Sequence, residues 1–501
     1  MGKYDDIINM KWPVPSKRPR MDMESRAKIF LPFSALKGLG NAIDEQNKTK
    51  DNMKENKMGT MPVNKLLINM ALPMMISMLV QALYNIVDSI FVARISEEAL
   101  TAVSMAFPMQ NLMIGVAGGV GVGTNALLSR ALGEGRHEEA DKMAVQGIFI
   151  TACSYIIFLV IGLFFAREFF VIQGANEVIA DYGYDYLSVI LIISFGCLFQ
   201  MIFERLLQAT GRTFYSMITQ GTGAIINIIL DPILIFGLLG APRLGIVGAA
   251  AATVAGQIVA AIMAVIFNIK VNKEIHITFK GFRPSGKRIC NILFIGIPSV
   301  IMMAIGSVMT FCMNKILVVF TSTAVAVFGV YFKLQSFAFM PIFGMNSGMV
   351  PIIAFNYGAK REDRVIQTLK LAVMYAEIIM ILFMIAVQIF PVPMLSIFSA
   401  SSDMIRMGVP ALRTISISFI FAGICIICSS FFQALGSSIY SMLVSFVRQI
   451  IFLVPCAYIF SRTGNVNLVW WAWPIAELAS VALSVFFFVR VKKKKFGFME
   501  Q

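Results

Sequence analysis

Charged side chains are scarce in this sequence: Asp, Glu, Lys and Arg together make up 14% of it, whereas a typical soluble domain contains about 25%. Hydrophobic residues make up 58%, and the mean hydropathy is +0.77. This composition excludes a soluble globular fold. Because a helix needs about 20 predominantly apolar residues to cross a bilayer, the sequence predicts an all-α polytopic membrane protein.

Residues that carry catalysis or bind metals are also rare. Both histidines, His137 and His276, fall in predicted loops, so the apolar segments offer no ligand set for a metalloprotease or a haem. The seven cysteines are odd in number and lie almost entirely in apolar segments, which argues against a disulfide framework. No glycine-rich loop followed by Lys and Ser or Thr is present, so ATP-driven pumping is not indicated. We expect a protein that is not an enzyme and has no cofactor.

Twelve apolar segments long enough to cross a membrane follow residue 60. They are predicted at 65–92, 99–128, 142–166, 179–205, 214–238, 244–269, 288–317, 322–355, 366–390, 405–432, 438–460 and 466–489. Residues 1–60 are polar and lack the apolar core of a signal peptide. We predict that these sixty residues form a flexible cytoplasmic extension.

Basic residues are concentrated in two further segments, the predicted inter-lobe loop at 271–287 and the tail at 491–501. The loop between the seventh and eighth helices carries no charge. Because Lys and Arg are retained on the cytoplasmic side, this asymmetry predicts that both termini are cytoplasmic. It also explains most of the formal net charge of +14, so no nucleic-acid partner is expected.

The two halves of the chain repeat each other at a constant offset. Pro298 follows Pro73 by 225 residues (298 − 73 = 225). The same offset relates Phe107 to Phe332, Gln110 to Gln335, Gly119 to Gly344, Gly123 to Gly348, Gly133 to Gly358, and Gln208, Ala209 and Gly211 to Gln433, Ala434 and Gly436. Each half has an even number of helices, so the halves are parallel repeats. We predict two pseudo-symmetric six-helix bundles, an N-lobe at 61–270 and a C-lobe at 288–490, around a central cleft, as in an alternating-access transporter. Nothing in the sequence resembles the selectivity filter of a channel.

Two aspartates lie inside apolar segments of the N-lobe. Asp88 is in QALYNIVDSIFVAR and Asp231 in NIILDPILIFG, whereas the matched positions of the second half hold Met313 and Cys456. A charged side chain at the bilayer centre costs about 2.5–3.5 kcal/mol on insertion scales, so such residues face a protein interior or a water-filled path. Each aspartate lies about 9 Å below the expected outer end of its helix, by the rise per residue. The two carboxylates are therefore predicted at the same depth.

Further polar side chains are expected near these carboxylates. Asn227 lies one turn before Asp231 on the same helix face, and the hydroxyl of Thr253, on the next helix, is predicted at similar depth. Carboxylate, amide and hydroxyl oxygens suit a small cation such as Na⁺. They equally suit a proton, because two neighbouring carboxylates in a poorly hydrated pocket cannot both ionise cheaply. The alternative is that the two aspartates only hydrogen-bond neighbouring helices.

Several stretches resemble segments of the multidrug and toxic compound extrusion (MATE) transporters, in particular the bacterial DinF-like branch. They are ALPMMISMLVQALYNIVDSIFVAR, GVGVGTNALLSRALGEG, QATGR and PIIAFNYGAKRED, in the order expected for the family. The resemblance covers nearly the whole chain after residue 60. It implies an antiporter in the bacterial cell membrane that acts as a monomer and exports amphipathic, often cationic organic compounds while Na⁺ or H⁺ enters. It also implies a cation site at Asp88, Asn227, Asp231 and Thr253.

Other positions carry weaker expectations. Gln81, Tyr84 and Asn85 are candidates for the wall of the substrate cleft, and Pro73 and Pro232 for bending points of their helices. In the second half we expect Arg448 to pair with Glu477, while the roles of Lys315 and Lys333 stay open. Glu204 and Arg205 are expected to form an interfacial pair near the inner end of the fourth helix.

Three other functions stay open from the sequence. A lipid-linked oligosaccharide flippase would be expected to show a cleft rich in Arg and Lys. The remaining two are a membrane-embedded enzyme and a receptor or scaffold without transport. The sequence does not distinguish Na⁺ from H⁺ as the coupling ion.

Overall fold

The computed structural model describes residues 56–398 and 401–496. These residues form helices joined by short connections, without a β-strand among them. The first half contains α4 (Lys57–Thr60), α5 (Val63–Ala93), α6 (Glu97–Gly133), α7 (His137–Phe164), α8 (Ala166–Ile172), α9 (Glu177–Ile192), α10 (Phe195–Ala209), α11 (Thr213–Phe236), the 3₁₀ turn η2 (Leu238–Gly240) and α12 (Ile246–Lys270).

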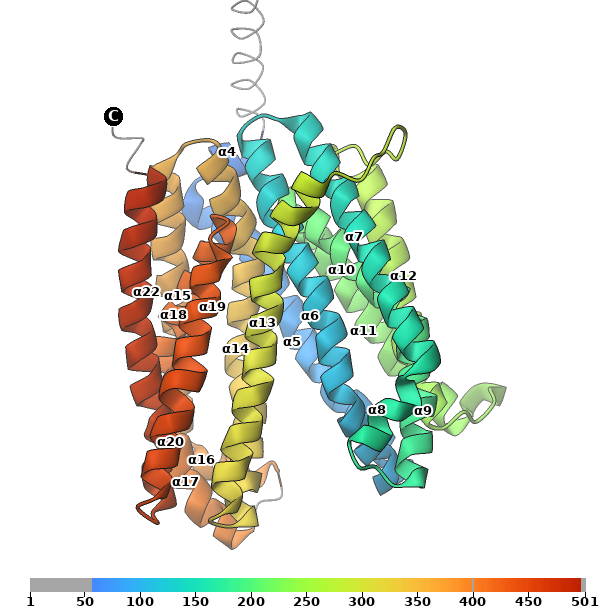
Figure 1. The fold of residues 1–501 in the computed structure, drawn as a ribbon, viewed down its shortest axis with the longest axis vertical. Coiled ribbons are helices and arrows are strands. Elements are labelled where there is room, and N and C mark those ends of the chain that lie inside the picture. Colours follow the sequence, from blue (N-terminus) through green and yellow to red (C-terminus); the bar gives the residue numbers. More distant parts are fainter. Residues whose placement is uncertain (1–55, 399–400, 497–501) are drawn as a thin grey trace, which may run out of the picture. The chain divides into compact units, whose positions relative to one another are not determined.

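The second half begins with α13 (Gly286–Val318) and ends with the long helix α22 (Ala472–Phe496). Between them lie α14 (Ser322–Gly358), α15 (Glu362–Ile389), α16 (Pro391–Ser396), α17 (Ser402–Ser416), α18 (Phe419–Ala434), α19 (Ser438–Phe446), the π-helical η3 (Val447–Leu453), α20 (Val454–Ser461) and α21 (Val466–Val469). Figure 1 shows α5, α6, α13 and α14 at the centre, with α7–α12 on one side and α15–α22 on the other.

The predicted repeat is confirmed in the helix boundaries. α14 begins 225 residues after α6 (322 − 97 = 225) and ends 225 residues after it (358 − 133 = 225). The helix caps follow the same offset. Ser96 Oγ accepts a hydrogen bond from the backbone nitrogen of Ala99 (3.0 Å), and Thr321 Oγ1 accepts one from that of Ala324 (3.1 Å). Each cap satisfies an N–H that has no partner within the first helical turn.

The turns after the helices repeat as well. Gly211 and Gly436 end α10 and α18 with φ values of 79° and 68°. Gly135 has a φ of 73° after α6, and Lys360 takes the matched left-handed conformation after α14 with a φ of 57°. A residue with a Cβ is strained in this region of φ and ψ, so the second half keeps the turn without the glycine that favours it.

The predicted twelve spans correspond to ten long apolar helices and two bent helix pairs among the described residues. The fourth and tenth spans are each a bent pair of helices and not one straight helix. α9 and α10 meet at 43°, and α17 and α18 at 50°. Ser194 and Ser418 lie at the breaks, and Ser418 Oγ donates to the carbonyl oxygen of Ile415 over 2.6 Å. A serine bonded back to the preceding turn in this way bends a helix.

Two predicted boundaries need correction. The polar extension was expected to reach residue 60, but residues 57–60 form α4, and Met58 in it is only 1% exposed. The carbonyl oxygen of Met58 accepts hydrogen bonds from Asn356 and Arg364 of the second half. The basic tail was expected from residue 491, but α22 continues to Phe496. Residues 1–55 of the predicted extension lie outside the described residues.

The two halves contact each other through glycines of α6 and α14. A Cβ added to Gly119 would lie 2.7 Å from the carbonyl oxygen of Gly296 on α13, and one added to Gly344 would lie 2.5 Å from Cα of Met75 on α5. A Cβ on Gly133 would overlap the carbonyl oxygen of Phe355. The helices approach this closely because glycine has no side chain.

We call the end of the molecule that holds the C-terminal ends of α6 and α14 the junction end.

Candidate functional site

The two aspartates of the first half lie at equivalent positions of adjacent helices. α5 packs against α11, and Asp88 and Asp231 each lie five residues before the end of their helix (93 − 88 = 5; 236 − 231 = 5). Asp231 is fully buried, and Asp88 is partly buried with an Oδ1 that has no hydrogen-bond partner among the described residues. The structure thus places both predicted aspartates at matching positions of two helices that pack together.

Asn227 connects Asp231 to the neighbouring helix α12. With its amide nitrogen facing the carboxylate, Nδ2 donates to Asp231 Oδ2 over 3.3 Å. The amide oxygen then accepts from Oγ1 (3.1 Å) and the backbone nitrogen (3.2 Å) of Thr253. This orientation is assigned from the hydrogen bonds, because it satisfies both ends of the amide. Asp231, Asn227 and Thr253 therefore form one hydrogen-bonded cluster, with Asp88 beside it.

The cluster offers oxygen atoms and few softer ligands. Among residues 56–398 and 401–496, no group of three or more His, Cys, Asp and Glu side chains is placed to hold a metal ion. Two carboxylates with an amide and a hydroxyl are hard donors, which suit a small alkali cation or a proton better than a transition metal.

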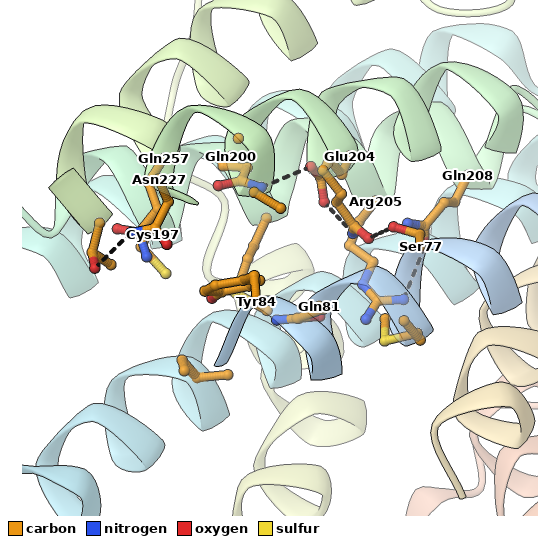
Figure 2. A pocket seen from close by; sticks show the side chains of 17 residues that line it. Ser77, Gln81, Tyr84, Cys197, Gln200, Glu204, Arg205, Gln208, Asn227 and Gln257 are labelled. Carbon is orange, nitrogen blue, oxygen red and sulfur yellow. Dashed lines mark hydrogen bonds between the residues drawn. The ribbon is translucent and has the colours of Figure 1, made fainter. Parts of the chain in front are cut away.

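A polar cavity of about 130 Å³ adjoins this cluster inside the first half. It lies between α5, α6, α10, α11 and α12, and Asn227 and Thr253 form part of its wall (Figure 2). The other lining residues are Ser77, Met78, Gln81, Tyr84, Ile114, Cys197, Gln200, Met201, Glu204, Arg205, Gln208, Gln220, Gly223, Ala224 and Gln257. Drug-sized ligands occupy pockets of about 300–1,000 Å³. This cavity therefore suits a small cation or water rather than a drug.

The structure places the three weaker cleft candidates differently from one another. Gln81 and Tyr84 line the cavity within the first half. Asn85 is exposed and is not part of the cavity wall. Pro73 and Pro232 both lie within unbroken helices, α5 and α11, so neither bends its helix enough to divide it in this conformation.

The expected pairing of Glu204 with Arg205 is wrong. Glu204 is only 3% exposed, and its carboxylate accepts hydrogen bonds from Gln200 and Gln220. Arg205 donates instead to Gln208. The sequence signal at Glu204 was the same as at Asp88, an acid within an apolar segment. The predicted end of the fourth helix, residue 205, places Glu204 near the membrane surface, whereas α10 continues to Ala209.

The pairing predicted in the second half is confirmed. Arg448 Nη1 lies 3.0 Å from Glu477 Oε1, and both side chains are largely buried. Arg448 lies in the π-helical stretch η3. Lys315 and Lys333 are exposed and lie over the aromatic rings of Phe311 and Phe398, each 5.8 Å from the ring centre.

Two six-helix repeats that contact each other through their first two helices, with a carboxylate cluster in only one of them, define a two-lobed membrane transporter. The MatE family model matches residues 73–233 and again residues 298–459, once in each half. The chain therefore belongs to the MatE family of transporters, and it is not an enzyme. The narrower DinF-like assignment stays a prediction.

Relatives and solved structures agree with this assignment. The chain is 27% identical over 417 residues to the multidrug export protein MepA of Staphylococcus aureus (strain MSSA476), covering 83% of this chain and 91% of that protein. It is 26% identical to MepA of Staphylococcus haemolyticus (strain JCSC1435), over 84% of this chain and 92% of that one. The structure is similar to a crystal structure of MATE in the straight conformation, with a TM-score of 0.82 and 25% identity over 88% of this chain and 98% of the other. It is similar also to the outward-facing conformation of a MATE family multidrug resistance transporter, with a TM-score of 0.82 and 26% identity over 87% and 97% of the two chains.

Proposed function

We propose that the protein is a multidrug efflux antiporter, which exports small amphipathic, often cationic organic compounds across the cell membrane while Na⁺ or H⁺ enters. The observation that carries this proposal is the hydrogen-bonded cluster of Asp231, Asn227 and Thr253 beside Asp88, which only one of the two repeats contains. The names of the multidrug export relatives support the class of substrate. The protein acts as a monomer in this proposal.

The coupling cation binds between the two carboxylates. Two like charges in a poorly hydrated site repel each other strongly, and a cation or a proton between them removes that repulsion. The unpartnered Oδ1 of Asp88 provides a ligand for it. For Na⁺, the oxygens of Asn227 and Thr253 complete the ligand set. For H⁺, the same groups hydrogen-bond the protonated carboxyl group.

Helix α5 connects the cation cluster to the contact between the halves. Its C-terminal part carries Asp88, and its segment from Met70 to Met75 packs against Gly344 and Gly348 of α14. Pro73 lies within that segment and removes one backbone hydrogen bond of the helix. A rearrangement of α5 on cation binding therefore reaches the contact with α14 directly, with Pro73 as the bending point.

Transport follows from different affinities of the two conformations. With both termini in the cytoplasm, the junction end faces the cytoplasm and this conformation is closed on that side. Drug and cation must favour different states, because a ligand that binds both states equally shifts neither. Moving an equilibrium from 1:99 to 99:1 requires about 10⁴-fold tighter binding to the favoured state, or about 5.5 kcal/mol. Relief of the repulsion between the two carboxylates is a source of such a difference.

The pairing of Arg448 weakens the case for a flippase. That case depended on basic side chains in the cleft, namely Lys315, Lys333 and Arg448. Arg448 is paired with Glu477 at 3.0 Å and so is not available to a pyrophosphate group. The first half presents carboxylates instead.

The proposal is tested by flux measurements on the purified protein in proteoliposomes. A fluorescent cationic dye is loaded, and its efflux is followed under an imposed Na⁺ gradient and separately under an imposed pH gradient, with protein-free liposomes as the control. We expect one of the two gradients to accelerate dye efflux, which identifies the coupling ion. If neither gradient drives efflux of any cationic dye tried, antiport is refuted and lipid-linked substrates should be tested.

A further inference from the structure

The cavity in the first half extends well beyond the cation cluster. Along α11, Gln220 lies seven residues before Asn227 (227 − 220 = 7), or about 10 Å at 1.5 Å per residue, and both line the cavity. Water in the liquid occupies about 30 Å³ per molecule, and a polar cavity with several hydrogen-bonding groups holds water readily. At about 130 Å³, this cavity has room for a few water molecules between its two ends.

Among the described residues that line the cavity, Glu204 is the only acid. Its Oε1 accepts hydrogen bonds from Gln200 Nε2 (3.0 Å) and Thr219 Oγ1 (2.9 Å), and its Oε2 accepts one from Gln220 Nε2 (2.6 Å). Within the described part of the chain, no Lys, Arg or His forms an ion pair with this carboxylate. A buried charge without an ion-pair partner is expensive. Glu204 is thus a carboxylate held by neutral donors alone, in contact with a polar cavity.

Within the described residues, Arg205 is the one basic side chain in the cavity wall, and it does not form an ion pair with Glu204. Besides Glu204, the titratable or charged side chains in the cavity wall are Arg205 on α10, Cys197 on the same helix, and Tyr84 on α5; the described residues of α6, α11 and α12 contribute none. Arg205 Nη1 donates to Gln208 Oε1 (2.9 Å) and to Ser347 Oγ (3.3 Å). Figure 2 shows Gln200 bonded to Glu204, whereas Arg205 is bonded to Gln208.

The amides that surround Glu204 favour a proton over a metal cation. Both Gln200 and Gln220 direct their NH₂ groups at the carboxylate, so their oxygens face away from it. The oxygen of Gln220 accepts a hydrogen bond from Ser77 on α5. A metal ion at Glu204 would require both amides to turn, whereas a proton needs only one lone pair of the carboxylate.

We propose that Glu204 is a second proton-binding site of the transporter, separate from the Asp88 and Asp231 pair and reached through the water-accessible cavity. A hydronium ion in the cavity transfers its proton to one carboxylate oxygen and becomes water, and the side chain changes from an anion to a neutral acid. The role of this site in transport rests on the proposed antiport function; the binding of the proton itself does not.

Arg205 communicates the state of Glu204 to the other half. Arg205 directly follows Glu204 in the chain and carries the opposite charge. It donates a hydrogen bond to Ser347 on α14, three residues after Gly344 in the contact between the halves. Neutralising Glu204 removes the attraction that acts on Arg205 and so alters this contact. Ser77 on α5 is linked to Glu204 through Gln220, which gives the site a second connection, to the helix that carries Asp88.

Infrared difference spectroscopy of the purified protein tests the proposal directly. Spectra are recorded as the pH is lowered across the range in which the protein stays folded, in the stretching region of protonated carboxyl groups. The variants are Glu204→Gln, Glu204→Asp and, as a matched control, Glu377→Gln, which neutralises a partly buried acid of α15 outside the cavity. Size-exclusion chromatography establishes that each variant is folded.

We expect a pH-dependent carboxyl band that Glu204→Gln removes, Glu204→Asp shifts in frequency, and Glu377→Gln leaves in place. If Glu204→Gln does not fold, the proposal is tested by the frequency shift of the carboxyl band in Glu204→Asp. A spectrum that Glu204→Gln and Glu204→Asp leave unchanged would overturn the proposal. Because the measurement needs no drug and no gradient, its failure is distinct from a failure of dye efflux, which concerns the antiport function alone.

Discussion

Substituting Gly344 by alanine tests whether the glycine contacts hold the halves together in this conformation. The added Cβ would lie 2.5 Å from Cα of Met75 and 2.6 Å from the carbonyl oxygen of Met74. Carbon atoms in favourable contact are about 3.5–4.0 Å apart, so α5 and α14 must separate by about 1 Å. Gly329→Ala is the matched control, because Gly329 lies on the same helix and a Cβ there meets nothing within 4 Å.

The expected size of the effect follows from comparing the two variants. Both gain about 0.8–1.0 kcal/mol of helix propensity when glycine becomes alanine, so this contribution cancels. Overpacking a close contact costs about 1–3 kcal/mol. Gly344→Ala should therefore be less stable than Gly329→Ala by about 1–3 kcal/mol, which is roughly a 5- to 150-fold change in the population of this conformation.

Two measurements check this expectation. Thermal unfolding, followed by tryptophan fluorescence, compares the stabilities. Spin labels at Lys142 and Gln367, two exposed positions related by the repeat (367 − 142 = 225), report the distance between the halves in a cysteine-free background. We expect a lower unfolding temperature and a shifted distance distribution for Gly344→Ala. If both quantities match those of Gly329→Ala, the glycine contact does not control this conformation.

Three further predictions concern strain, a buried ion pair and the cation cluster. Lys360→Gly removes a side chain from a left-handed backbone position and should raise the free energy of unfolding by about 1 kcal/mol; an unchanged or lower unfolding temperature would contradict this. Arg448→Met leaves Glu477 buried without its partner and should lower the free energy of unfolding by about 3–5 kcal/mol. The double variant, Arg448→Met with Glu477→Leu, should recover much of this loss. A double variant no more stable than the single one would refute the pairing argument. Thr253→Val removes a hydroxyl that donates to the amide oxygen of Asn227 and should weaken Na⁺ stimulation of dye efflux about tenfold or more if Na⁺ is the coupling ion. An unchanged Na⁺ dependence would show that Thr253 is not part of the site.

The repeat could be predicted from the sequence because the same residues recur at a constant offset in the two halves. Pro73 and Pro298, or Gly133 and Gly358, needed no structure to be matched, and the caps Ser96 and Thr321 follow the same offset. The breaks near Ser194 and Ser418 were missed, since a bend inside an apolar segment does not change its hydropathy.

The candidate site could likewise be predicted from the sequence only in part. The depth of Asp88 and Asp231 follows from counting residues along two helices, and the structure places both five residues before the helix end. The cavity at Glu204 depends on how α5, α10 and α11 pack together, and no periodicity in the sequence reports that packing. A shift of four residues in the expected end of α10 was enough to place Glu204 at the membrane surface.

The central claim is that Asp88 and Asp231 act together as the coupling site. It is tested most directly by gradient-driven dye efflux from proteoliposomes that contain Asp88→Asn, Asp231→Asn or both substitutions, with Asp181→Asn as the control. Asp181 carries the same functional group but is exposed and pairs with Arg167. Residues that act as one unit give strongly non-additive losses.

We predict that each single substitution abolishes the acceleration of efflux by the gradient, that the double variant is no worse than either one, and that Asp181→Asn matches the wild type. Gradient-driven efflux that survives in both Asp88→Asn and Asp231→Asn would contradict the account, because the coupling ion would then bind elsewhere.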